Sequence, residues 1–283
     1  MKKKLFGLVL CLMICMGVVM AQAQRKKPLA IGLLHVYENE AYTTSADFSV
    51  IKRVFSYSVY DSLHDSILGL LAGKTDYINI PDFLAEYLVD AQPQLEMGQK
   101  EGIGSFCMAT SPAKKALRDK LDRGIRILKE NGKLAALLNQ YLPAKNLPEA
   151  DALPAKAGRQ TIRIAMTGDF PPLDYLNASG KPAGFNRALL SALSEVLEVN
   201  FIVVPVAAGD RLDSLVSNKV DALFYAFGYG SEKNMDSRVL LTSEYYQCGG
   251  RILVSKGRLD EINKRRAEVA KLYTAKTGRP IYL

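Results

Sequence analysis

The residues that follow the apolar run Ala222–Ala226 could form a loop that binds an anion. Two glycines within Gly228–Ser231 leave backbone N–H groups exposed, and the serine can cap a helix that starts at Glu232. The N-terminus of a helix attracts carboxylate and phosphate groups even without a charged side chain. A plain helix-capping loop has the same composition, so the sequence leaves both interpretations open.

A second polar group stands at the end of another predicted strand. Asp169 follows the alternating residues Ile162–Met166 and directly precedes the rigid aromatic segment Phe170–Pro172. Its carboxylate can bind the ammonium group of a ligand or cap its own turn, and the turn is slightly favoured.

No arrangement of residues is typical of an enzyme active site. Neither a serine–histidine–acid set nor paired carboxylates stand out, and no cysteine spacing fits a metal site. His35 and His64 are isolated in the sequence, and we expect them to be polar surface residues. We therefore expect a protein without catalytic activity, metal or cofactor.

Residues 1–23 have the pattern of a secretory signal peptide that is cleaved near Ala23. Lys2–Lys4 precede the apolar run Leu5–Met20, which is short for a membrane anchor, the weaker alternative. Cys11 and Cys15 lack the small residue that normally precedes a lipidated cysteine. The expected location is the periplasm, as a soluble exported protein.

The composition of the 283-residue chain, 48% hydrophobic and 23% charged, is that of a globular protein. Loss of the three leader lysines lowers the formal net charge from +8 to +5. No basic stripe carries interleaved aromatic residues, so nucleic acid is not expected as a partner. The charge weakly favours an anionic solute or a membrane surface. Cys107 and Cys248 remain after processing, and their spacing alone does not establish a disulfide.

Hydrophobic spacing predicts alternating strands and helices. The prolines at 171 and 172 exclude a helix after the strand at 162–166, a turn follows at 177–180, and the next helix starts after Gly184. In the N-terminal half we expect strands at 29–34, 54–60 and 75–80, helices at 62–71 and 83–88, and two helices after Ser111-Pro112 that are separated by Asn131-Gly132.

A short internal repeat links the two halves. Residues 211–223 align without gaps on residues 66–78, and most apolar positions coincide. Gly73 or Asn218 follows the helix, and both residue types tolerate the positive φ of a helix end. The motif Lys-x-Asp comes next in both copies. The repeat suggests two α/β lobes built alike, although a match this short can arise by chance.

Residues 161–186 resemble the opening of the family 3 extracellular solute-binding proteins, which are periplasmic clamshell receptors for polar amino acids and related solutes. The matching pieces are Phe170–Pro172, Tyr175, Gly180 and Gly184–Asn186. Leu117–Leu142 resembles the closing helices of the family. The resemblance implies an α/β fold, the two-lobe periplasmic-binding-protein clamshell of type II.

The order of these pieces differs from that of the family, which has the first lobe, the second lobe and then the closing helices. We expect a circular permutation of one clamshell, and the alternative is a pair of incomplete repeats. The strands at Gly102–Ala109 and Gln247–Val254 resemble the two that cross between the lobes and should be neighbours. The expected divisions are a signal peptide at 1–23, a second-lobe-like segment at 28–105, a crossover strand and closing helices at 106–145, a linker at 146–160, a first-lobe-like segment at 161–250, and a crossover strand and C-terminal helix at 251–283.

The resemblance also implies ligand-contacting positions. Phe170 could cover a ligand face or pack between the lobes, and the loop after Ala226 and Gly228 would hold an anion. Gly230 replaces the threonine of the family and Lys233 replaces its carboxylate-binding arginine, so the bidentate pair is lost. Pro81 stands at the family's acidic position, with Asp82 one residue later. The standard amino-acid pocket is therefore incomplete.

We therefore expect a protein that closes over a small polar or anionic, amino-acid-like solute, for delivery to an inner-membrane ABC transporter or for sensing. One alternative is a scaffold or interaction protein that keeps the fold without a solute. Another is a periplasmic dehydratase of the cyclohexadienyl type, because a few family members have that activity.

Overall fold

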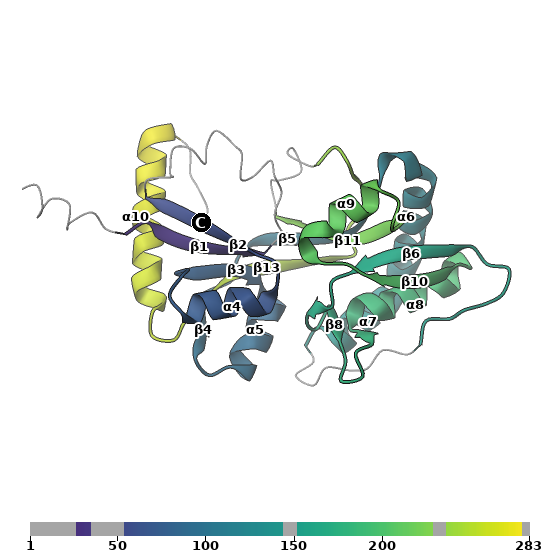
Figure 1. The fold of residues 1–283 in the computed structure, drawn as a ribbon, viewed down its shortest axis with the longest axis horizontal. Helices are drawn as coiled ribbons and strands as arrows, with labels where there is room; N and C mark the ends of the chain where they lie inside the picture. Colours follow the sequence, from purple (N-terminus) through teal and green to yellow (C-terminus); the bar gives the residue numbers. More distant parts are fainter. Residues whose placement is uncertain (1–26, 35–53, 144–151, 229–235, 279–283) are drawn as a thin grey trace, which may run out of the picture.

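The structure is a computed structural model that describes residues 27–34, 54–143, 152–228 and 236–278. It has two α/β lobes joined through one continuous sheet (Figure 1). The lobe that comes first along the chain is called the second lobe, after the segment it resembles in the family. It contains strands β1 (Leu29–Leu34), β2 (Phe55–Tyr60), β3 (Tyr77–Pro81) and β4 (Leu95–Met97) and helices α4 (Leu63–Leu71) and α5 (Asp82–Ala91). The first lobe contains strands β6 (Thr161–Met166), β10 (Asn200–Pro205), β11 (Ala222–Gly228) and β12 (Leu240–Leu241), helices α8 (Phe185–Leu197) and α9 (Arg211–Val216), and a small sheet of β7 (Asp169–Phe170), β8 (Asp174–Leu176) and β9 (Pro182–Ala183).

The two halves of the large sheet mirror one another in strand order. The order is β10-β6-β11-β5-β13-β3-β1-β2, where β5 (Glu101–Thr110) and β13 (Tyr246–Ser255) form the centre. In the first lobe β10, β6 and β11 are parallel, and in the second lobe β2, β1 and β3 are parallel. Each trio ends on an antiparallel central strand. The predicted α/β class and two-lobe clamshell are confirmed.

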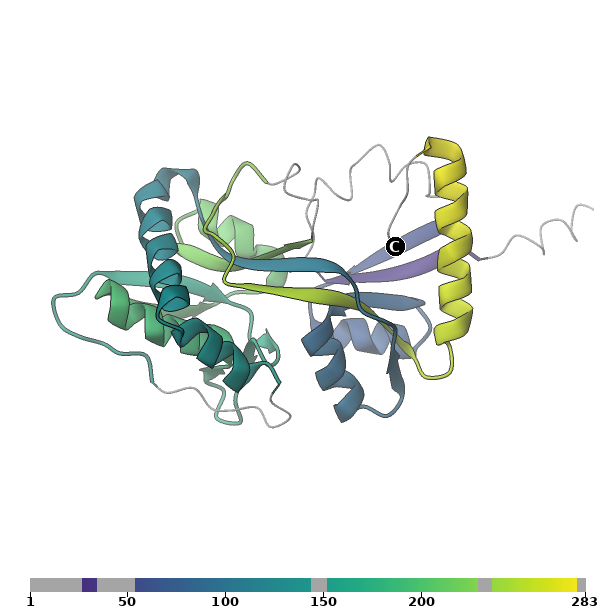
Figure 2. The same cartoon turned by 180° about the vertical axis from the view of Figure 1, so that it is seen from behind.

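The central pair carries the chain between the lobes, as predicted. Strand β5 pairs antiparallel with β13, and Tyr246 lies opposite Phe106. Both strands run from one lobe to the other side by side (Figure 2). Cys248 lies opposite Gly104 rather than Cys107, and both cysteines are buried free thiols. Adjacent strands that place two cysteines out of register cannot bring their Cβ atoms to disulfide distance.

Each crossing strand delivers helices that cover the lobe it enters. Strand β5 leads through a 3-10 turn into α6 (Lys115–Glu130) and α7 (Lys133–Tyr141), which pack on α8 of the first lobe. Strand β13 leads into α10 (Leu259–Thr277), whose apolar side chains lie against the second lobe. The hydrophobic core between α10 and the second lobe contains Leu29, Ile31, Phe55, Tyr77, Ile252, Val254, Ile262, Val269 and Tyr273. None of the helices in the described part of the chain is long and apolar enough to cross a membrane.

The repeated Lys-x-Asp motif performs the same structural task in both lobes. In the first lobe Asp221 accepts the Arg163 N–H at 2.8 Å and returns its own N–H to the Arg163 carbonyl at 2.8 Å. The Arg163 guanidinium and the Lys114 ammonium pair with the same carboxylate. The side-chain hydrogen bond from Arg163, and that from Lys114, hold the pKa of Asp221 well below its usual range.

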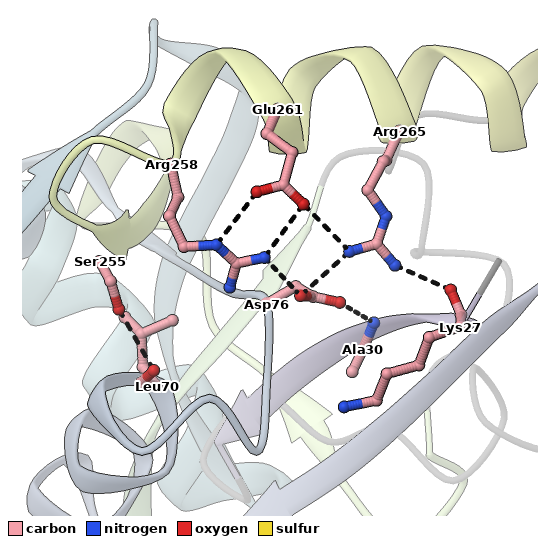
Figure 3. A network of polar contacts seen from close by, with 8 residues as sticks. All are labelled: Lys27, Ala30, Leu70, Asp76, Ser255, Arg258, Glu261 and Arg265. Atoms are coloured by element: carbon pink, nitrogen blue, oxygen red, sulfur yellow. Dashed lines mark hydrogen bonds and ion pairs between the residues drawn. The ribbon is translucent and has the colours of Figure 1, made fainter.

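In the second lobe Asp76 takes the place of Asp221. It accepts the Ala30 N–H at 2.9 Å and donates its N–H to the Ala30 carbonyl at 2.7 Å. Arg258, the N-cap of α10, and Arg265, inside the helix, each place a guanidinium nitrogen 3.1 Å from its carboxylate (Figure 3). In both lobes the aspartate therefore ties the middle of the first strand to a cation delivered by a crossing strand.

The helix ends preceding these aspartates also correspond. Gly73 has φ of 69° and Asn218 has φ of 59°, the left-handed conformation predicted for both. Strand β3 starts at Tyr77, two residues later than predicted, because Thr75 and Asp76 are in the turn that reaches Ala30. The repeat is a structural feature and not a chance match.

The start of the described chain lies against its last helix. Arg265 in α10 donates from Nη2 to the Lys27 carbonyl at 2.9 Å (Figure 3). The chain therefore enters the second lobe beside the helix that completes it, as a permuted order requires. We propose that the chain is a circular permutation of one clamshell.

The permutation predicts that the ends can be rejoined. From Arg265 to Gly278 the helix rises about 20 Å, and the eight residues of 279–283 and 24–26 can span about 26 Å. A chain with Leu283 joined to Gln24 and opened at Asn146 should fold with a melting temperature within a few degrees of the unpermuted chain that starts at Gln24, measured by circular dichroism. The matched control, opened instead inside β6 at Ile164, should not fold. Failure of the first variant to fold would contradict the proposal.

The clamp in the first lobe predicts a pH-dependent loss of stability in Asp221→Asn. The substitution removes a charged acceptor shared by two cations, which should lower the free energy of unfolding at pH 7 by about 2 kcal/mol, measured by urea denaturation. Because folding lowers the pKa of Asp221, its ionised carboxylate stabilises the fold at pH values above the unfolded-state pKa near 4. This stabilisation is lost as the pH falls toward the folded-state pKa. The difference from wild type should therefore shrink between about pH 5 and pH 2. Asp119→Asn, on an exposed pair with Lys115, is the control and should be near neutral. A difference that stays constant with pH would contradict this.

Candidate functional site

The two lobes meet where the small sheet of the first lobe faces the N-terminus of α4 in the second. Asp169 in β7 accepts a hydrogen bond from the Leu63 N–H, the first amide of α4, at 3.2 Å. Ser62 is the N-cap of this helix, and its hydroxyl accepts the Asp65 N–H at 3.0 Å. A carboxylate is favourable at this position because of the free amides and the helix dipole. Asp169 thus contacts the opposite lobe, and its role in binding a ligand stays a prediction.

Little space remains around this contact. The cavity there has a volume of about 10 Å³, which is room for no more than one water. Side chains from both lobes line it: Leu34, Tyr60, Asp61, Leu63, Asp169, Phe170 and Ala208. The described residues of the two lobes therefore touch at this point.

Phe170 is part of that contact and part of the core. It is 6% exposed and belongs to the main hydrophobic cluster, with Leu173 and Phe185. Phe170 thus packs near the lobe interface, and its role in covering a ligand face stays a prediction.

Behind Asp169 lies a buried carboxylate that the sequence analysis did not single out. Asp174 accepts the Thr167 N–H at 3.1 Å and the Gly168 N–H at 3.0 Å. Burial raises the pKa of Asp174 to about 6, against the opposing effects of these amides and of the buried Arg211. Asp174 therefore holds in place the two residues that precede Asp169. A lone acid in the apolar run after two prolines was the available signal.

Asp82 contributes to the hinge between the lobes. Its carboxylate accepts the Gly249 N–H at 3.2 Å and lies 2.5 Å from the Lys100 ammonium. The pairing of β5 with β13 shifts register between Cys248 and Gly250, which lie opposite Gly104 and Glu101, so β5 carries the extra residue of a bulge across from Gly249. Asp82, in the second lobe, supplies the hydrogen-bond acceptor for the Gly249 amide at this irregularity.

The remaining predicted positions follow β11. Ala226 and Gly228 lie in this strand, opposite Phe106 and Gly104 of the crossing strand β5. Gly230 and Lys233 lie outside the described residues. The prediction that the loop after β11 faces Phe170 is therefore untested, and so is the anion role of Lys233.

The groups that could act as nucleophiles or metal ligands are inert or isolated. Burial raises the pKa of the Cys107 and Cys248 thiols to about 12, so neither is a thiolate at neutral pH. His64 is exposed, as predicted, and His35 lies outside the described residues. No group of three metal-ligating side chains occurs in the part of the chain that the structure describes.

A separate groove of about 510 Å³ lies on the first lobe, between the turn that joins α6 to α7 and helix α8. Its lining includes the charged residues Lys133 and Glu195, one of each sign, and it does not border the lobe contact. We assign no role to it.

The hinge geometry predicts that Asp82 is a stabilising rather than a ligand-binding residue. Asp82→Ala should lower the free energy of unfolding by about 1–3 kcal/mol, because the buried Gly249 amide loses its acceptor, measured by urea denaturation. The control is Lys100→Ala, which leaves the Gly249 hydrogen bond in place and should cost less. If Asp82→Ala leaves stability unchanged but abolishes binding of a solute, the assignment to the hinge is wrong.

Comparison with known proteins finds a family that resembles the C-terminal part of the chain. The model of the bacterial extracellular solute-binding proteins, family 3, matches residues 162–276, from β6 through β13 and into α10. No curated protein matches the chain. Solved structures similar to it include one entitled Tv2483 bound to L-arginine (11% identity, 92% of this chain and 95% of that chain, TM-score 0.42).

Two further structures show comparable similarity. A putative L-cystine ABC transporter from Listeria monocytogenes has 8% identity, 90% and 99% coverage and a TM-score of 0.41. The oxidised form of OxyR has 11% identity, 89% and 97% coverage and a TM-score of 0.43. Scores below 0.5 do not establish a relationship by themselves. Residues 162–276, which include most of the motifs at 161–186, match the model of the family 3 extracellular solute-binding proteins, and the resemblance is confirmed.

Proposed function

We propose that the protein is an exported, non-enzymatic solute-binding protein that closes its two lobes over a small polar or anionic solute. The observation that carries the proposal is the family match over the first lobe together with the antiparallel crossing strands β5 and β13. Two lobes joined by such a pair can open and close about it, and closure gains energy only from contacts that the open form lacks. Delivery to an inner-membrane transporter, or to a sensor, would follow from this role.

The proposed solute site lies after β11. Strand β11 ends at Gly228 beside the crossing strand, and the loop that follows includes Gly230 and Lys233. Amides of a glycine-rich loop and a lysine attract an anion, although a lysine cannot form the planar bidentate pair of an arginine. We propose an anionic or zwitterionic solute for this reason, and Phe170 would border it from the first lobe.

A second candidate is a scaffold or interaction protein that keeps the clamshell without a solute. The observations in its favour are internal: Asp169 binds the opposite lobe, Asp82 binds the hinge, and the space at the lobe contact is about 10 Å³. Two carboxylates that would bind the amino group of a solute are thus already occupied.

A thermal-shift screen separates these two candidates. The mature protein would be heated with amino acids, small carboxylates, phosphate and short peptides. A solute present at 100 times its dissociation constant should stabilise the fold by about 2.7 kcal/mol, which raises the melting temperature. A broad screen without any shift, on protein shown to be folded, would favour the scaffold.

The role of Lys233 can be tested once the screen yields a solute. Lys233→Ala should weaken an anionic solute about tenfold, since a charge-assisted contact contributes roughly 1.5 kcal/mol, and should affect a neutral solute less. Isothermal titration calorimetry measures both. Lys219→Ala, at an exposed position of the same lobe, is the matched control and should leave both affinities unchanged. Equal losses for charged and neutral solutes would exclude an anion role.

A further inference from the structure

The contact between Asp169 and α4 uses the chemistry by which helix ends bind anions. The acceptor is a carboxylate from the first lobe, and the donor is the Leu63 amide at the start of a nine-residue helix of the second lobe. The two residues are 106 positions apart in sequence and belong to different lobes. Leu63 is buried and Asp169 is half-buried, so the hydrogen bond is partly shielded from water, which strengthens it.

We propose that Asp169 is a built-in latch that holds the clamshell closed without a solute, and that Asp174 is the positioning residue that keeps it aligned. The inference goes beyond the proposed solute-binding role, and its test requires no solute. Its failure would therefore leave the outcome of the solute screen untouched.

The positioning role follows from the backbone. Asp174 binds the amides of Thr167 and Gly168 with its two carboxylate oxygens, and Gly168 directly precedes Asp169. Strands β7 and β8 pair, so that Phe170 lies opposite Asp174. An ionised Asp174 thus fixes both sides of Asp169. A protonated one accepts more weakly and leaves the turn less constrained.

Three charged or titratable groups act on Asp174 from the elements around it. Arg211 in α9 is buried and favours the ionised form, whereas Asp169 in β7 disfavours it. Tyr245 is buried nearby, donates its hydroxyl to Asn186 at 3.3 Å and has its own pKa raised well above the usual value, mainly by burial. With the Asp174 pKa at about 6, its carboxyl is ionised at pH 7.5 and largely protonated at pH 5. The latch should therefore loosen as the pH falls through 6.

The experiment measures the distance between the lobes in the mature full-length protein. Spin labels would be attached at Lys74→Cys in the second lobe and Ile202→Cys in the first, both exposed positions. The native thiols are buried, and the unsubstituted chain shows whether they react. Double electron–electron resonance at pH 7.5 should give one short distance for the wild-type lobes. Lowering the pH to 5 should shift the population to longer distances, with a midpoint near 6.

Two independent variants remove the latch from either side. Asp169→Ala deletes the acceptor, and Leu63→Pro deletes the donor at the first helical position, where proline is tolerated. Each should lower the ratio of closed to open molecules about tenfold at pH 7.5, as expected for one charge-assisted hydrogen bond. Leu63→Ala is the matched control, because it loses similar packing but keeps the amide. Asp119→Ala is the charge control. Circular dichroism would confirm that each variant is folded.

Asp174→Asn tests the positioning role separately. This variant should be as open at pH 7.5 as wild type is at pH 5, and its distances should no longer change between the two. A wild type that is open at pH 7.5, or latch variants as closed as their controls, would overturn the latch. A pH response that persists in Asp174→Asn would overturn the role of Asp174. If Asp174→Asn does not fold, a flat pH profile of wild type between 5 and 7.5 would still overturn that role.

Discussion

The antiparallel pairing of β5 with β13 is the constraint on which the whole arrangement depends. These strands are the centre of the continuous sheet. They pair with each other, and in addition β5 pairs with β11 of the first lobe and β13 with β3 of the second. Because they run in opposite directions, each carries the chain out of one lobe and into the other. Every covering helix that follows a crossing strand therefore packs on the lobe its strand has entered (Figure 2).

The lobes are completed from a distance in sequence, and the two aspartates of the repeat show how. Asp221 binds a lysine that follows β5, and Asp76 binds two arginines that follow β13 (Figure 3). In each case the carboxylate accepts an amide of the first strand of its lobe. It also pairs with a basic side chain from a segment that follows a crossing strand. Partly buried carboxylates need such partners, so neither lobe reaches full polar satisfaction until the crossing strand is in place. Each lobe therefore depends on the crossing strands for the partners of its aspartate carboxylate, and this dependence follows from the chain topology.

The internal hydrogen bonds of two carboxylates also bear on which solute can bind. The carboxylates nearest the lobe contact and the hinge, Asp169 and Asp82, both accept amides of other elements. A solute that needed either group would have to displace an internal hydrogen bond of comparable strength. The loop after β11 is free of this conflict in the proposal, because its attraction for anions comes from amides and Lys233. This difference is the reason for proposing an anion rather than a cationic amino group as the recognised feature.

Much of the architecture could be predicted from local patterns. Hydrophobic spacing placed the strands and helices to within a few residues, and the left-handed residues Gly73 and Asn218 ended the two equivalent helices. These features depend on neighbours three or four residues apart, which the sequence displays directly. The neighbouring crossing strands were also predicted, through the resemblance to a known family.

What the sequence by itself determined was therefore the set of elements, their order and the type of fold. Only the tertiary structure decided which groups each polar side chain meets. Asp169 and Asp174 are close in sequence, yet one reaches the opposite lobe and the other turns inward to its own backbone. The partner of Asp82 is the Gly249 amide, 167 residues away. Such pairings depend on how separately formed elements pack and on which buried amides remain unpaired, and no spacing along the chain encodes either.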